Sequence, residues 1–276
     1  QGYTFWLKQF DIHVLHIMVL RLSCRRLCVS DTILNKQWSY FSDLCGKWTG
    51  TWSRYTVSPN GQLVPGEQLC ATCHPTLSAD GRSVHHINRY EPGKAPPGPP
   101  GRIVDGLHEV DFGRFDHSNF RNPFGPHSLA IYMNGAAVVG SASLRDPPRG
   151  MVAVELVSVW AFSRRRLVAV WRSEDPTCHH LASVTAIEEM NTADPASEQP
   201  GPMHDEQLSF KLGRRNVTDA SGQVGAEDVH CTLECATEDT LHGGILAVLP
   251  RRLSLQEPGN KFEISMGWLC NHRQFV

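Results

Sequence analysis

The chain has 276 residues, of which 41% are hydrophobic and 20% charged, a composition typical of a soluble globular protein. Its 26 Lys and Arg residues nearly balance 28 Asp and Glu residues, so no overall basic field attracts nucleic acid or an anionic membrane. No stretch approaches the roughly 18 uninterrupted apolar residues that a spanning helix needs. We therefore expect neither a nucleic-acid partner nor a transmembrane segment.

The first 33 residues differ in composition from the rest. An apolar run at 12–20 is broken by His13 and His16 and is followed by Arg21, and Glu is absent from the whole segment. This pattern resembles an organelle transit peptide more than a secretory signal. We interpret 1–33 as a leader or transit-like segment outside the fold, and the abrupt end at Val276 as a missing C-terminal strand.

From residue 34 onward the sequence predicts one short helix and then strands. Helical turns are expected at 35–44, ending at Gly46, and strict alternation at 48–57 predicts a strand. The pair Asn134-Gly135 separates two β-prone runs and predicts a tight hairpin. The strands expected on this basis are 48–57, 69–77, 84–90, 128–133, 136–144, 151–162, 166–172 and 181–190. About eight antiparallel strands at this spacing favour a barrel or sandwich, which we expect over 34–190.

Proline-rich segments interrupt this strand rhythm. Residues 91–101 hold five prolines, cannot pair in a sheet and are expected to form an inserted loop. Residues 191–206 are polar with three prolines and are expected to form a linker. Strand-like runs at 207–212, 229–236, 244–253 and 261–269 then predict a smaller second β domain over 207–276. So few strands cannot close a barrel, which suggests that this domain is incomplete.

The residues Cys70, Cys73 and His74 match the C-x-x-C-H pattern of covalent haem attachment. Alternation along a strand would place Cys70 and Cys73 on opposite faces, whereas haem attachment needs both thiols on one side. We therefore favour two packed strand thiols over a haem cofactor. Zinc is disfavoured as well, because none of the Cys and His pairs lies in the context of a knuckle turn. The run Arg164-Arg165-Arg166 is interpreted as a solvated turn between strands.

The motif Gly46-Lys47-Trp48 opens the first long strand and resembles the G-x-W signature of lipocalins and other calycins. In that superfamily the Trp closes the base of a barrel, often beneath a late-strand Arg, and Arg172 is the candidate here. The stretches 48–55, 134–137 and 243–250 are similar to one calycin family, catalogued as domain of unknown function thirty-five ninety-eight. The family occurs in photosynthetic lineages and is distantly similar to bilin lyases, so the resemblance implies a lipocalin-like barrel and a plastid location.

Strand alternation carries Trp52 and Arg54 inward if Trp48 points inward. A guanidinium inside a barrel needs a carboxylate or an anionic ligand, because an unpaired buried charge costs several kcal/mol. Glu155 is a candidate carboxylate, since its strand face is otherwise apolar. Two interpretations stay open. In the first, Arg54 is structural, and it pairs with Glu155 or lies at a solvated barrel mouth. In the second, it binds the acidic group of a ligand that packs on Trp52 and Trp171.

These observations favour a mainly β protein whose first barrel binds a small hydrophobic or amphipathic ligand. The resemblance implies a tetrapyrrole or fatty-acid-like compound. Two alternatives stay open: a bilin-lyase-like transferase or isomerase, with a possible acceptor protein as partner, and an interaction module without a ligand.

Overall fold

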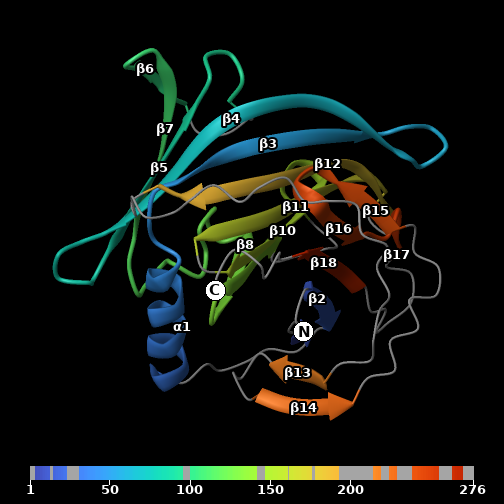
Figure 1. The fold of residues 1–276 in the computed structure, drawn as a ribbon, viewed down its shortest axis with the longest axis horizontal. Coiled ribbons are helices and arrows are strands. Elements are labelled where there is room, and N and C mark those ends of the chain that lie inside the picture. The colour runs from blue at the N-terminus through green and yellow to red at the C-terminus, as the bar shows by residue number, and fades with distance from the viewer. Residues whose placement is uncertain are drawn as a thin grey trace.

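The structure is a computed structural model that describes residues 4–12, 15–23, 31–95, 100–141, 147–160, 162–175, 178–192, 214–218, 224–228, 238–254 and 263–269. In this part the chain forms two antiparallel sheets and one α-helix (Figure 1). No helix within these ranges is long and apolar enough to cross a lipid bilayer.

The larger sheet is a meander in which most strands pair with the next strand along the chain. The strands are β3 (Trp48–Val57), β4 (Leu63–Leu77), β5 (Val84–Tyr90), β6 (Arg102–Val104), β7 (Leu107–Phe115), β8 (Ser128–Met133), β9 (Ala136–Ser141), β10 (Met151–Trp160), β11 (Ser163–Asp175), β12 (Cys178–Asn191) and β17 (Arg252–Ser254). Their order is β6-β7-β5-β4-β3-β12-β11-β10-β9-β8, and β17 pairs with β12. The pairing of β3 with β12 joins the first and last strands of the meander, as their register Trp48↔Asn191 to Thr56↔Ser183 shows.

Alternation decides which side chains of a strand share a face. On β3, Trp48 and Trp52 are 2% and 8% exposed and share one face, which we call the inner face, whereas Tyr55 lies on the opposite, outer face. On β11 the same rule places Arg164 and Arg166 on the inner face. The inner face therefore combines aromatic and charged side chains, an unusual mixture for a buried surface.

The helix α1 (Asp31–Asp43) packs where the two ends of the sheet approach each other. Trp38 and Phe41 of the helix contact Phe120 at ring-centroid distances of 5.3 and 5.9 Å, and Phe41 also contacts Phe115 of β7 and Tyr132 of β8. The same core includes residues of β5, β7, β8, β9 and β10. The sheet thus curls around a common core, and the helix covers the seam between β7 and β8 (Figure 1).

A closed barrel, as the sequence analysis expected, is not found in the described residues. No strand pairing joins β8 to β6 or β7 there. The segment between β7 and β8 places Phe120, which is 1% exposed, in the aromatic core at the seam. Side-chain packing therefore fills the place where a closed barrel would have a ladder of backbone hydrogen bonds.

The smaller sheet contains strands from both ends of the chain. They are β1 (Thr4–Ile12), β2 (Leu15–Ser23), β13 (Arg214–Thr218), β14 (Val224–Asp228), β15 (Glu238–Leu241), β16 (Ile245–Val248) and β18 (Glu263–Leu269), in the order β14-β13-β1-β2-β18-β16-β15. The segment interpreted as a leader thus contributes two strands, because β1 pairs with β13 and β2 with β18.

The smaller sheet packs on the outer face of the larger one. Ile245 and Met266 belong to the same buried cluster as Leu156, Trp171 and Val184 of the larger sheet. Short 3₁₀ turns, η1 (Pro148–Gly150) and η2 (His242–Gly244), precede β10 and β16. The backbone N–H of His242 donates to the hydroxyl of Tyr55 over 2.8 Å, which joins the two sheets directly.

The predicted strands agree with the structure most closely at the hairpins. The bounds of β3, β5 and β8 are those expected from the sequence, and Gly135 in the β8–β9 turn has a φ of +66°. Strands β6 and β7 were not expected, since apolar alternation is weak there. The predicted strands 207–212 and 229–236 and most of the linker 191–206 lie outside the described residues.

Candidate functional site

Four charged side chains gather on the inner face, contributed by three neighbouring strands. They are Glu155 of β10, Arg164 and Arg166 of β11, and Glu189 of β12, which we call the arginine–glutamate cluster. The register explains the gathering, because Arg164 stands directly opposite Glu189 and Arg166 opposite Ile187. The side chain of Glu189 is 0% exposed, and those of Arg164 and Arg166 are 5% and 9% exposed.

Glu189 is the centre of this cluster. Its carboxylate accepts hydrogen bonds from Arg164 Nε over 2.7 Å and from Arg166 Nε and Nη2 over 3.1 and 3.0 Å. Arg166 Nη1 in turn donates to Glu155 over 2.8 Å. Two positive and two negative side chains therefore balance, as burial requires.

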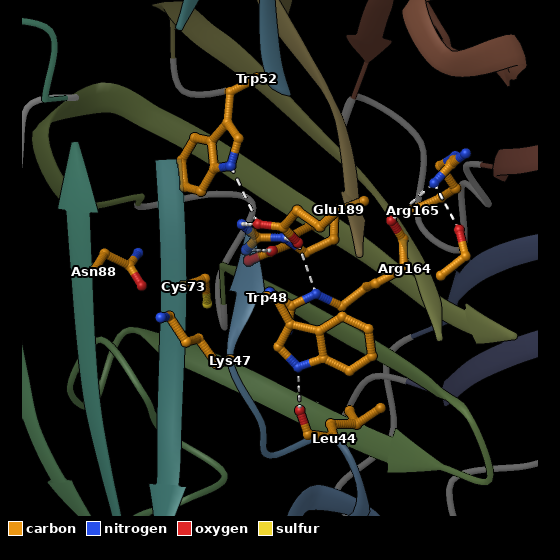
Figure 2. A network of polar contacts seen from close by, with 12 residues as sticks. Leu44, Lys47, Trp48, Trp52, Cys73, Asn88, Arg164, Arg165 and Glu189 are labelled. Carbon is orange, nitrogen blue, oxygen red and sulfur yellow. Dashed lines mark hydrogen bonds and ion pairs between the residues drawn. The ribbon is translucent and has the colours of Figure 1, made fainter. Parts of the chain in front are cut away.

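The two tryptophans of β3 pack against the arginines of the cluster. The guanidinium of Arg164 lies 4.6 Å from the ring of Trp48, and that of Arg166 lies 4.7 Å from the ring of Trp52. Trp52 Nε1 also donates to Glu189 over 3.2 Å. Figure 2 shows Glu189 between the two indoles, with Trp48 donating to the carbonyl of Leu44 below. Cation–π contacts at buried sites contribute about 2 kcal/mol or more each.

Electrostatics keep Glu189 and Arg166 ionised in spite of their burial. Burial alone raises the pKa of Glu189, but Arg164 and Arg166 outweigh it and hold that pKa below its usual value. Burial lowers the pKa of Arg166, whereas Glu189 and Glu155 outweigh it and raise that pKa above its usual value. The charges thus stabilise one another, and removing one would leave the others uncompensated.

A second polar chain runs along the neighbouring strands β4 and β5. Cys73 Sγ lies 3.2 Å from His86 Nε2, and the same nitrogen lies 2.9 Å from Asn88 Oδ1. Asn88 Nδ2 donates to the hydroxyl of Tyr90 over 2.9 Å. Cys73 is the register partner of both Trp48 and Asn88, so Cys73 and Asn88 lie on the inner face beside the arginine–glutamate cluster (Figure 2).

The structure separates Arg54 from Glu155. Arg54 Nη1 donates to Glu67 over 3.1 Å and Nη2 donates to the carbonyl of Lys94 over 2.8 Å, while Glu155 pairs with Arg166. The side chain of Arg54 is 30% exposed, so it lies at the solvent-accessible edge of the inner face.

The cation that packs on Trp48 is Arg164, and the expectation of Arg172 is wrong. Antiparallel pairing places the start of β3 beside the end of β12 and the start of β11, where Arg164 stands. Arg172 is exposed and lies eight residues further along β11, roughly 26 Å away at the rise of an extended strand. Trp171 belongs to the outer-face core and donates to the carbonyl of Pro250, so it does not approach Trp52.

The cysteines of the C-x-x-C-H motif differ in their surroundings. On β4, Cys70 is exposed and Cys73 is 2% exposed, while His74 follows on the exposed side. Among the described residues, no group of three or more His, Cys, Asp or Glu side chains has a metal-binding arrangement.

Sequence reasoning missed the residues that the inner face uses most. Arg164 and Arg166 were interpreted as part of a solvated turn, yet they are buried on β11. Alternation within 163–175 would have assigned both to one face, and Glu189 two residues before the end of β12 would have been their natural partner. The paired cations were missed because charge runs are usually exposed.

The fold and the inner face define a mainly β protein with a curled antiparallel sheet and a buried polar site. The chain belongs to the family described as "Domain of unknown function (DUF3598), N-terminal", which matches residues 34–194. A solved structure from Nostoc punctiforme PCC 73102, described as a protein with unknown function from the DUF3598 family, is 17% identical. The match covers 85% of this chain and 99% of that chain with a TM-score of 0.44. No curated protein matches the chain.

Proposed function

We propose that this chain binds a small amphipathic molecule on the inner face of the larger sheet, with the acidic group of the ligand at Arg54. The observation that carries the proposal is the position of Arg54 at the edge of an apolar cluster. Its guanidinium is partly exposed, while Trp52, Leu69 and Tyr90 behind it are 8%, 2% and 1% exposed. A charged, accessible group beside a buried apolar cluster suits a fatty-acid-like or tetrapyrrole carboxylate.

The present partner of Arg54 is one that a ligand can replace. Glu67 is 43% exposed, and an exposed ion pair of this kind contributes about 0.2–1 kcal/mol. Lys94 stands nearby, with its amine 3.8 Å from Glu67 and 3.1 Å from Glu91. A ligand carboxylate that takes the place of Glu67 would therefore keep two cations within reach.

We propose further that the larger sheet is an open variant of the lipocalin-like calycin fold. Two features support this relation: the meander whose first strand pairs with its last, and a helix packed against the end of the curled sheet. In such folds ligands lie on the concave face. A ligand on the inner face of the larger sheet would lie in the corresponding place.

The test compares an acid with its ester. Titration with cis-parinaric acid and its methyl ester, followed by ligand fluorescence, measures both affinities for the wild-type chain and for Arg54→Met. Loss of the charge-assisted pair should weaken binding of the acid by about 1.5–3 kcal/mol and affect the ester far less.

The matched control is Glu67→Gln, which removes the competitor of the ligand but leaves Arg54. We expect it to tighten binding of the acid and to leave binding of the ester unchanged. Equal losses for acid and ester in Arg54→Met, or no binding of either by the wild-type chain, would contradict the proposal.

A further inference from the structure

The thiol of Cys73 and the imidazole of His86 form a close pair on the inner face, apart from the ligand site proposed at Arg54. Their sulfur and Nε2 atoms are 3.2 Å apart and come from neighbouring strands, β4 and β5. The strand positions of both residues are fixed by the register, in which Cys73 pairs with Asn88 and Pro75 with His86.

The hydrogen-bond pattern around His86 defines the direction of this contact. Asn88 donates from Nδ2 to Tyr90, which directs its Oδ1 toward His86 Nε2 at 2.9 Å. An amide oxygen only accepts, so Nε2 carries the hydrogen and donates. The sulfur of Cys73, which lies 3.2 Å from the same nitrogen, is then the acceptor in this contact, a role that a thiolate fills better than a neutral thiol.

Two arginine side chains of β11 also stabilise negative charge on Cys73. The titratable groups that interact electrostatically with Cys73 are His86 and Tyr90 of β5, Arg164 and Arg166 of β11, and Cys45 after α1. Burial raises the pKa of the Cys73 thiol, but Arg164 and His86 outweigh it, followed by Arg166, and lower that pKa to about 7. Cys45 shows the contrast, since burial and the neighbouring Cys73 raise its pKa to about 12.

Arg164 also has a donor that the cluster does not use. Its Nε bonds Glu189, whereas its Nη2 is buried and has no partner among the described residues, in a residue that is 4% exposed. A buried donor without an acceptor costs about 1–3 kcal/mol. A small bound molecule with acceptor oxygens would satisfy it.

We propose that Cys73 is a nucleophilic thiolate that reduces a hydroperoxide, with Arg164 Nη2 as a donor to the peroxide oxygens and His86 as the proton donor to the leaving group. The pairing of a thiolate with a free buried guanidinium N–H suits a substrate that accepts hydrogen bonds and is attacked at oxygen. Because Cys73 is 2% exposed, we expect small electrophiles to react with it faster than large ones.

The chemistry is a two-electron oxidation of sulfur. The thiolate attacks the terminal oxygen of R–O–OH, so that an S–O bond forms and the O–O bond breaks. Cys73 becomes a sulfenic acid, and the leaving RO⁻ takes the proton from His86 to give ROH. The proton that Cys73 lost to His86 is thus returned, and the hydroperoxide is the oxidant.

The test is the rate at which each cysteine of the reduced full-length chain is oxidised. Hydrogen peroxide and tert-butyl hydroperoxide are the two probes, and peptide mass spectrometry after dimedone trapping locates the sulfenic acid. The matched control is Cys70, which lies on the same strand with an exposed side chain. We expect Cys73 to be oxidised at least tenfold faster than Cys70 at pH 7 by one or both probes.

The pH dependence separates a built site from a merely reactive thiol. The oxidation rate of Cys73 should rise with a midpoint near pH 7, whereas an ordinary thiol has its midpoint near 8.5. His86→Gln should move the midpoint of Cys73 upward and lower the rate at pH 6.5 by about tenfold for each unit of pKa. The wild-type comparison with Cys70 stands even if that variant does not fold.

The proposal is overturned if Cys73 reacts with neither probe, or if its rate and midpoint equal those of Cys70. Because the experiment does not involve Arg54 or an amphipathic ligand, its failure leaves the proposed binding function untouched.

Discussion

Replacing Glu189 with Gln tests whether the arginine–glutamate cluster holds the inner face together. The substitution keeps the size and shape of the side chain but removes the negative charge of the carboxylate, whose oxygens accept hydrogen bonds from Trp52, Arg164 and Arg166. It also introduces an amide NH₂ that faces guanidinium donors. Removing one partner of a fully buried ion pair costs about 3–5 kcal/mol, and the 0% exposure of Glu189 places it in that class.

Urea unfolding followed by tryptophan fluorescence measures this loss at pH 7. The control is Glu67→Gln, which removes the same chemical group from an ion pair that is 30% and 43% exposed, and it should cost about 0.2–1 kcal/mol. If both variants lose the same free energy of unfolding, the cluster does not stabilise the fold in the way that its burial implies.

Further predictions concern acid stability, the first long strand and its glycine. The folded-state pKa of Glu189 is lowered, so its stabilisation is complete above the unfolded value of about 4.3 and is lost as the pH falls through the folded-state pKa; acid unfolding of Glu189→Gln should lack this component. Trp48→Ala should lower the free energy of unfolding by about 3–5 kcal/mol, and an unchanged urea midpoint would show that the indole is not a core group. Gly50→Ala would place Cβ 1.8 Å from the carbonyl oxygen of Glu188, so its cost should reach the upper end of about 1–3 kcal/mol; Gly140→Ala, with 3.3 Å to Ala153 O, should cost less in the same assay.

The sequence allowed most of the larger sheet to be predicted, because its strands obey local rules. Alternation at 48–57 and the turn at Asn134-Gly135 are signals contained in a few consecutive residues. The inward position of Trp48 and Trp52 followed from the same rule. What alternation does not contain is the pairing between distant strands, and so the partners of each inward side chain could not be read from it.

The candidate site shows this limit clearly. Arg54 and Glu155 were each assigned to the correct face of their strands, but they pair with Glu67 and Arg166 respectively. The choice of Arg172 for Trp48 failed because the register of β11 against β12 was unknown. Likewise, the strands at 4–12 and 15–23 were missed because composition alone suggested a leader; the two strands pair with each other, but their other partners, β13 and β18, lie more than 190 residues away.

The pairing of β3 with β12 has a consequence for how the protein reaches its fold. Trp52 and Glu189 are separated by 137 residues, so one edge of β3 stays without its partner until the whole meander has been synthesised. Contacts of such long sequence separation slow folding, since loop closure must precede the gain from pairing. During synthesis, β3 exposes an edge of unpaired backbone N–H and C=O groups with which other strands can pair. Truncation before residue 178 should therefore leave a chain that aggregates, and completion of β12 should be the step that commits it to the native state.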